Sequence, residues 1–186
     1  MRDDGLVFPV GIRSESPHPF RSFENGGNTL KLLRYGAPGQ EKPALLDAKG
    51  GLRDLSGVIP DLAGKALTSA SLAKIKAVAP ESLPLVSGSP RIGACVADVR
   101  NFIAVGLNFA DHAAETGAEI PKEPILFNKA PNCIVGPNDD VIIPKGSQKT
   151  DWEVELAIVI GDGGSYIEEK DAMAAIAGFC VCNDVS

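Results

Sequence analysis

The segment TDWEVELAIVIGDG, residues 150–163, is a strongly apolar run that contains two glutamates two positions apart. Its apolar residues predict a β-strand. Side chains at positions i and i+2 of a strand point to the same face, about 6.6 Å apart along the backbone, so Glu153 and Glu155 share one side. Two carboxylates about 5 Å apart in a partly dry site would repel by about 3 kcal/mol. We therefore expect a positively charged group between them.

Asp184 supplies a third carboxylate, near the end of the strand predicted for FCVCNDV, residues 179–185. An Asn-Asp pair at the end of a strand is usually turn chemistry. Together with Glu153 and Glu155, however, Asp184 would complete an all-oxygen site. Such a site suits a hard divalent ion, Mg²⁺, Mn²⁺ or Ca²⁺, rather than zinc.

A second candidate site is an imidazole beside a carboxylate. The segment NFADHAAETG predicts a short helix with Asn108 as its N-cap and Gly117 as its end. His112 and Glu115 are three residues apart and share a helix face, which suits a general base that activates water. A solvated helix face is the plainer interpretation. Lys129 could meet an anionic substrate, although an exposed lysine more often only aids solubility.

Composition and charge limit the class of protein. Apolar residues make up 44% of the 186 residues and charged residues 23%, which is an ordinary balance for a soluble globular chain. The net charge of −6 argues against nucleic acid or an anionic membrane as a partner. No apolar run approaches the ~20 residues that span a bilayer, and the N-terminus lacks the plan of a signal peptide. We expect a cytoplasmic protein.

The four cysteines form no C-x-x-C pair, which favours a reducing compartment. Cys180 and Cys182 share one face of the predicted strand and could be thiolate metal ligands. The simpler interpretation is that these two cysteines are small buried residues of the strand, because the sequence has no second cysteine pair to complete a metal site.

The pattern of the chain predicts a β-rich α+β fold. Residues 1–28 are rich in Ser, Pro, Gly and Asn without periodicity, which indicates a disordered extension or a misplaced translation start. Residues 29–80 predict a small β-rich module, and residues 79–90 a linker. Residues 91–186 then form the main part. The predicted strands cover residues 29–36, 43–51, 52–59, 91–98, 101–107, 124–130, 141–144, 150–163 and 179–185, with helices at 67–78, 108–117 and 168–178.

Four segments in order, FIAVGLNFADHAAETG, EPILFNKAPNCIVGPNDDVIIP, KTDWEVELAIVIG and AGFCVCNDVS, resemble the fumarylacetoacetate hydrolase family. The resemblance covers roughly residues 29–186, and the Glu-x-Glu strand followed by Asn-Asp is similar to the family's metal signature. It implies Glu153, Glu155 and Asp184 as ligands of Mg²⁺ or Mn²⁺. It implies His112 with Glu115 as the water-activating pair on a mobile lid. A rolled, mixed β-sheet and a homodimer of the full-length protein also follow from it.

The chain departs from the family pattern at its end. Family members continue beyond the Asn-Asp-x-Ser motif with further strands, a lysine and a Gly/Thr-rich segment at the substrate, whereas this sequence ends at Ser186. We therefore expect a fragment whose sheet is incomplete, whose strand edges are unpaired and which is inactive alone.

The activity implied by the resemblance is metal-dependent hydrolysis of a carbon–carbon bond in a 2,4-diketo acid of the acylpyruvate type. The N-terminal module most resembles members that act on 2,4-diketo-3-deoxy sugar acids or ureidoglycolate. Two alternatives stay open. The same site could serve a lyase, decarboxylase or isomerase, since stabilisation of an enolate by a metal serves all of them. The chain could also be an inactive fragment or an interaction protein.

Overall fold

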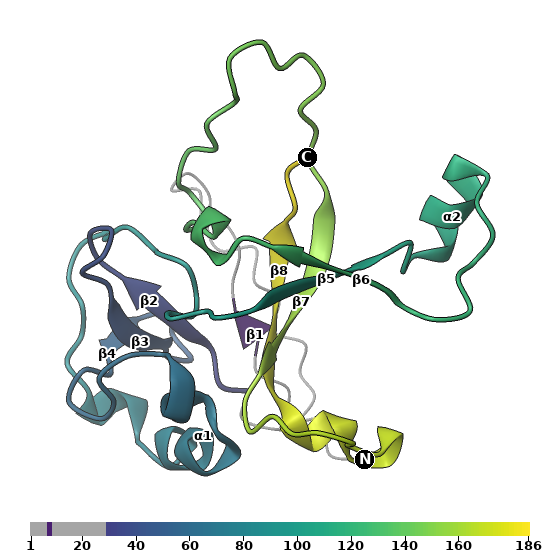
Figure 1. Cartoon of the computed structure of the whole chain (residues 1–186). Helices are drawn as coiled ribbons and strands as arrows, with labels where there is room; N and C mark the ends of the chain where they lie inside the picture. Colours follow the sequence, from purple (N-terminus) through teal and green to yellow (C-terminus); the bar gives the residue numbers. More distant parts are fainter. Residues whose placement is uncertain (1–6, 9–28) are drawn as a thin grey trace. The chain divides into compact units, whose positions relative to one another are not determined.

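The structure, a computed structural model, describes residues 7–8 and 29–186 (Figure 1). It divides into two compact units, described here one at a time. The first combines Met1–Ala97 with Gly136–Ser186, and the second is Asp98–Val135. The disordered extension expected over residues 1–28 lies outside the described residues, except for the short strand β1 (Val7–Phe8).

An antiparallel three-stranded sheet opens the first unit, in the order β2 (Leu32–Tyr35), β3 (Lys42–Leu46) and β4 (Leu52–Asp54). These strands confirm the predictions for this part of the chain, although β4 ends at Asp54, before the predicted limit. The turn between β3 and β4 is organised by Asp47, whose carboxylate accepts hydrogen bonds from Gly51 N (2.7 Å) and Arg53 Nε (2.8 Å). The hydrogen bond from Arg53 holds the pKa of Asp47 below its usual value.

Helix α1 (Ser69–Lys76) follows the 3-10 turn Gly64–Leu67 and confirms the predicted helix with its hydroxyl cap. Thr68 is the N-cap, and its Oγ1 accepts a hydrogen bond from Ser71 N. Ile75 on the inner face of α1 is buried in the core of this unit. The core joins the first sheet, α1 and the second sheet, and its buried members are Leu32, Leu45, Leu55, Leu62, Leu67, Ile75 and Ala177.

The segment expected as a linker, residues 79–90, runs back along the first sheet. Asp54 N donates to Pro84 O (2.9 Å) and Val86 N donates to Leu52 O (2.8 Å). This segment therefore provides hydrogen-bond partners for backbone groups on the outer edge of β4. The strand predicted for residues 91–98 is wrong. Only an isolated bridge between Ile92 and Tyr35 forms there, because the segment turns away after one pairing.

The second sheet has the order β1-β8-β7. Strand β7 (Val154–Ile160) pairs antiparallel with β8 (Ile176–Asn183), and β1 pairs parallel with β8, so the sheet is mixed. The helix predicted at residues 168–178 is a 3-10 helix, Glu169–Ala175, and β8 begins directly after it.

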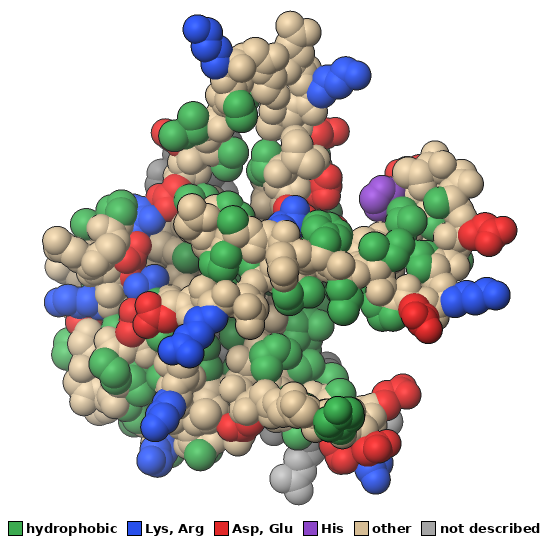
Figure 2. Space-filling view, viewed as in Figure 1, with side chains coloured by type: hydrophobic (Ala, Val, Ile, Leu, Met, Phe, Trp, Pro, Cys, Tyr) green, Lys and Arg blue, Asp and Glu red, His purple; other side chains and the backbone are tan. Residues whose placement is uncertain are grey.

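One face of β7 is inward and the other is open. Glu155, Ala157 and Val159 are partly buried, and Val159 packs against the core. The alternate residues of β7 are large, apolar and exposed: Val154, Leu156, Ile158 and Ile160. Hydrophobic side chains exposed at the surface are visible in Figure 2. Burial therefore alternates along β7 with a period of two residues, and the apolar side chains of one face remain exposed.

The strand predicted at residues 141–144 does not form. These residues are irregular, and Ile142 is 89% exposed. Residues 136–139 form a turn: Asp139 N donates to Gly136 O, and the Asp139 carboxylate accepts from Gly136 N at 2.7 Å.

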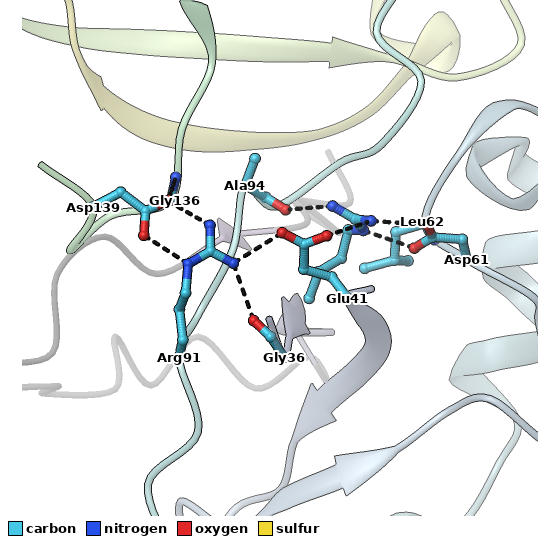
Figure 3. A network of polar contacts seen from close by, with 9 residues as sticks. Gly36, Glu41, Asp61, Leu62, Arg91, Ala94, Gly136 and Asp139 are labelled. Carbon is cyan, nitrogen blue, oxygen red and sulfur yellow. Dashed lines mark hydrogen bonds and ion pairs between the residues drawn. The ribbon is translucent and has the colours of Figure 1, made fainter. Parts of the chain in front are cut away.

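A chain of alternating acidic and basic side chains ties this turn to the first sheet (Figure 3). Asp61 holds Arg34 through two hydrogen bonds of 2.7 and 3.0 Å. Glu41 lies between Arg34 and Arg91, accepting from Arg91 Nη1 at 2.8 Å. Arg91 in turn makes a bidentate pair with Asp139. The network therefore links Arg34 of β2 and Glu41, which directly precedes β3, to the turn at Gly136.

The second unit is a two-stranded antiparallel ribbon, β5 (Phe102–Gly106) and β6 (Ile125–Lys129), with helix α2 (Ala110–Thr116) between them. Both strands and the helix confirm the predictions. The predicted N-cap is wrong: α2 begins after Phe109, which makes no side-chain capping bond, rather than after Asn108. Gly117 ends α2 as predicted, because its φ of 66° is the left-handed conformation that glycine adopts without strain.

Within the described residues, the helices are all too short or too polar to cross a membrane. The observed class is a small, β-rich α+β fold with open sheets, as the sequence predicted.

Candidate active site

Glu153 and Asp184 are brought together by the register of β7 and β8. Val154 pairs with Asn183 and Glu155 pairs with Cys182, and the ladder continues one step further, because Asp184 N donates to Glu153 O at 2.7 Å. Directly opposed residues of an antiparallel pair have Cβ atoms about 4.5–5.5 Å apart on the same face. Glu155, two positions along β7, lies on that face too. All three predicted metal ligands therefore share one face of this sheet.

Two residues beside Asp184, Asn183 and Ser186, also form hydrogen bonds with Glu153. Asn183 Oδ1 accepts a hydrogen bond from Glu153 N (3.0 Å), and Ser186 Oγ donates to Glu153 Oε1 (2.7 Å). Asp151 and Ser186 also exchange backbone hydrogen bonds of 2.8 and 3.2 Å. Asn183 and Ser186 are functional candidates that were not predicted from the sequence. Their position beside Asp184 in the segment NDVS was the signal that could have found them.

The side chains themselves are not gathered around one point. Across the part of the chain that the structure describes, no group of three or more His, Cys, Asp or Glu side chains is arranged to hold a metal ion. Glu153 is exposed and Glu155 is partly exposed, and side chains at a surface change rotamer within nanoseconds. The paired strands present three side-chain carboxylates, an all-oxygen donor set of the kind that Mg²⁺ and Mn²⁺ prefer. The donor set fits such an ion, while its assignment as ligands stays a prediction.

His112 and Glu115 lie in the second unit, on α2. Both side chains are exposed and one turn apart on the helix, while Ala113 between them is buried. Thr116 Oγ1 donates to His112 O at 2.9 Å, which stabilises the last turn of α2. The spacing of the predicted pair is thus present on the helix, and its role as general base stays a prediction.

Lys129 ends β6, where it pairs with Phe102 across the ribbon. Its ammonium lies 5.5 Å from the centroid of the Phe127 ring. Residues 127 and 129 are two apart in a strand and share a face, so this cation–π contact is worth about 0.5–1 kcal/mol at an exposed site. Lys129 is held near an aromatic ring, and its contact with a substrate stays a prediction.

The turn GDGG, residues 161–164, has a structural role. Asp162 accepts a hydrogen bond from Ser69 N (3.0 Å), the first residue of α1, and Gly161 N donates to Ala175 O (2.8 Å). The hydrogen bond from Ser69 lowers the pKa of Asp162. A Cβ added at Gly161 would meet Leu67 O at 2.5 Å, which explains why glycine stands there.

Comparisons with known proteins find a matching family model, similar sequences and similar folds. Residues 101–186 match the family model described as "Fumarylacetoacetate (FAA) hydrolase C-terminal". A Burkholderia cenocepacia protein named "Putative hydrolase" is 60% identical over 157 residues, which are 84% of this chain and 56% of that protein. The chain thus spans about half the length of the curated relatives it matches.

Two solved structures share the fold. The fumarylacetoacetate hydrolase from Exiguobacterium antarcticum is 29% identical with a TM-score of 0.68, covering 85% of this chain and 56% of that one. The 5-carboxymethyl-2-hydroxymuconate delta-isomerase from Mycobacterium smegmatis is 26% identical with a TM-score of 0.55, covering 83% and 54%. Residues 101–186 of this chain, which include β7, β8 and α2, therefore match the fumarylacetoacetate hydrolase C-terminal family domain.

Proposed function

We propose that the protein is a metal-dependent hydrolase that cleaves a carbon–carbon bond in a 2,4-diketo acid of the acylpyruvate type, with a 2,4-diketo-3-deoxy sugar acid as the narrower candidate. The observation that supports this most is the β7–β8 register, in which Glu153 lies opposite Asp184 with Glu155 on the same face. The match of residues 101–186 to the hydrolase family supports the same chemistry.

Glu153, Glu155 and Asp184 would hold Mg²⁺ or Mn²⁺. When bound, the divalent ion would supply the Lewis acid that stabilises negative charge on the oxygen of the departing pyruvate enolate. The chain's part in this is to present three carboxylates from two paired strands. The hydrogen bond from Ser186 to Glu153 would restrict the rotation of that carboxylate and so orient it.

His112 would remove a proton from water, whose oxygen then attacks the distal carbonyl of the diketo acid. Glu115, one turn along α2, would hold the imidazole in the tautomer that accepts this proton. The bond between the distal carbonyl carbon and its neighbouring methylene then breaks. His112 returns its proton to the methylene carbon that leaves with pyruvate. Lys129 would pair with the substrate carboxylate by its positive charge.

The partners of this function are a small keto-acid substrate and a second copy of the protein, as a homodimer. Neither nucleic acid nor a membrane surface belongs to the proposal, because the net charge of the chain is −6.

The test is turnover of an acylpyruvate by the protein purified from its own gene. Loss of the diketo acid should require Mg²⁺ or Mn²⁺, stop after chelation, and yield one pyruvate for each substrate consumed, measured by a coupled dehydrogenase assay. Metal-independent turnover, or consumption of substrate without pyruvate, would contradict the proposed hydrolysis.

Isomerisation is the second candidate, because the Mycobacterium smegmatis structure of the same fold is named as an isomerase. An isomerase would change the ultraviolet spectrum of a 2-keto acid without releasing pyruvate. Lyase and decarboxylase reactions are separated in the same experiment by assays for glyoxylate and carbon dioxide.

A further inference from the structure

Cys95 and Cys180 lie beside each other although 85 positions separate them in the sequence. Their sulfur atoms are 3.7 Å apart, within hydrogen-bonding distance for thiols. Cys95 belongs to the irregular segment that follows the network of Arg91, and Cys180 belongs to β8. Both thiols are free and partly buried, and both pack against the core of the first unit.

We infer that Cys95 and Cys180 form a reversible intramolecular disulfide when the protein meets a peroxide. A disulfide requires sulfur atoms about 2.05 Å apart, so the two must approach by roughly 1.6 Å. Cys180 is held in the ladder opposite Ala157. Cys95 lies outside any strand, in an irregular segment held on either side by the hydrogen bonds from Gly93 N to Arg34 O (2.9 Å) and from Ala97 N to Leu62 O (3.0 Å), so the approach falls to the Cys95 side chain and the few residues around it.

The environment assigns different roles to the two sulfurs. The hydrogen bond with Cys180 lowers the pKa of Cys95, whereas the hydrogen bond with Cys95 and burial raise the pKa of Cys180. Cys95 is therefore the sulfur that more readily becomes a thiolate, which is the form that attacks an oxidant. Cys180 is positioned to resolve the product.

The chemistry needs only the two thiols and one peroxide. The Cys95 thiolate attacks an oxygen of hydrogen peroxide, the O–O bond breaks, and water leaves as a sulfenic acid forms on Cys95. The sulfur of Cys180 then attacks the Cys95 sulfur, the S–O bond breaks, and a second water leaves with the thiol proton. Two thiols are oxidised by two electrons and one peroxide is reduced to two waters. A thiol reductant reverses the change.

The other two cysteines define the competing reactions. Cys182 lies two positions along β8 on the same face as Cys180, and its pairing with Cys180 would join residues of one strand. Cys133 is exposed in the second unit, where it would link two protein molecules. The variant Cys133→Ser removes that intermolecular reaction and is the background for the test.

The experiment oxidises the Cys133→Ser protein with one equivalent of hydrogen peroxide and counts thiols after denaturation. Two of the three remaining thiols should be lost, with a mass decrease of two hydrogen atoms. Trypsin should release the peptide of residues 92–100 joined to that of residues 171–186, separable by dithiothreitol. The matched variant with Cys182→Ser should keep this link, whereas Cys95→Ser and Cys180→Ser should each lose it.

The rate tests whether the folded structure directs the reaction. Because the sulfurs are already adjacent, the link should form on the order of tenfold faster in folded protein than in guanidinium chloride. An equal rate in both conditions would overturn the inference. Loss of two thiols that persists in Cys95→Ser would also overturn it, by assigning the disulfide to Cys180 and Cys182.

Discussion

Glu153, directly before β7, lies opposite Asp184, directly after β8, and a hydrogen bond of 2.7 Å from Asp184 N to Glu153 O joins them. The pair exists only in this register, because a slip of one residue moves every side chain of a strand to the opposite face. Asn183 and Ser186 reinforce the register through their hydrogen bonds to Glu153. The position of the carboxylates is therefore tied to the pairing of the strands.

The first prediction concerns the proposed metal ligands. Glu155→Gln and Asp184→Asn should each abolish the rise in melting temperature that Mg²⁺ or Mn²⁺ gives the protein, because a bound ion stabilises only the folded state. For an ion at about 100 times its Kd this stabilisation is about 2.7 kcal/mol. Scanning fluorimetry with and without each ion measures it. Glu168→Gln, a change of the same kind at an exposed site before the 3-10 helix, is the control. An unchanged metal effect in both ligand variants would refute the assignment.

The second prediction concerns the general base. In a full-length version of the protein, His112→Ala should lower the turnover of an acylpyruvate by about 10²–10⁴-fold, the range for loss of a positioned base. Metal affinity should stay near that of the parent, since imidazole is not in the proposed ligand set. Asp111→Asn, the neighbouring exposed position on α2, should leave turnover nearly unchanged. A collapse of metal binding in His112→Ala would instead make His112 a ligand.

The third prediction concerns Arg91. Its side chain is 26% exposed and bonds Glu41 and Asp139, whose side chains are 9% and 22% exposed. Arg91→Met would leave both carboxylates without this partner and should lower the free energy of unfolding by about 2 kcal/mol at pH 7. Urea denaturation measures the change. Lys74→Met removes an exposed charge of the same sign from α1 and should have little effect.

The same variant should change the dependence of stability on pH. The hydrogen bond from Arg91 lowers the pKa of Asp139. Burial raises the pKa of Glu41, but the hydrogen bonds and the positive charges of Arg91 and Arg34 together outweigh burial, and the net shift is downward. A depressed folded-state pKa gives stability that is present above the unfolded pKa of about 4 and lost as pH falls through the folded pKa. The parent should therefore lose stability more steeply than Arg91→Met below about pH 4. Parallel curves would contradict this role.

The fourth prediction compares two neighbouring residues of β7. Ile158 is 52% exposed, whereas Val159 packs against the core. Ile158→Thr keeps a β-branched side chain and should change the free energy of unfolding by less than about 0.5 kcal/mol while reducing self-association, because exposed apolar patches promote it. Val159→Thr should cost about 1–2 kcal/mol by burying a hydroxyl. Denaturation and light scattering measure the two effects. Equal costs would show that both faces of β7 are covered.

The fifth prediction concerns close packing at Gly136. A Cβ at this position would collide with Ile92 O, whereas a Cβ at Gly57 would meet nothing within 4 Å. Gly136→Ala should therefore lower the free energy of unfolding by about 1–3 kcal/mol. Gly57→Ala should be neutral or stabilising by up to about 1 kcal/mol, because alanine restricts the unfolded chain more than glycine. A neutral Gly136→Ala would show that the turn moves away from Ile92 at no cost.

Most of the helices and strands, and the three candidate carboxylates, could be predicted from the order of the amino acids. A strongly apolar run identified β7, the pattern of short strands identified β2, β3, β5 and β6, and Gly117 identified the end of α2, because these properties depend on residues close in sequence. The sequence also failed locally. Residues 91–98 and 141–144 have strand-forming composition without strand pairing, since a strand is stabilised by a partner that composition does not supply.

Which distant residues contact one another depends on the folded arrangement of the strands and helices. Glu153 faces Asp184 because β7 and β8 pair in one register, and no local pattern specifies the residue opposite a given position. Asp162 accepts a hydrogen bond from Ser69 N at the start of α1, 93 positions away in the sequence. Cys95 lies beside Cys180, 85 positions away. The links from Arg34 through Glu41 and Arg91 to Asp139 likewise join distant segments. Such contacts arise from the packing of the whole core, because burial brings together groups that the chain itself keeps far apart.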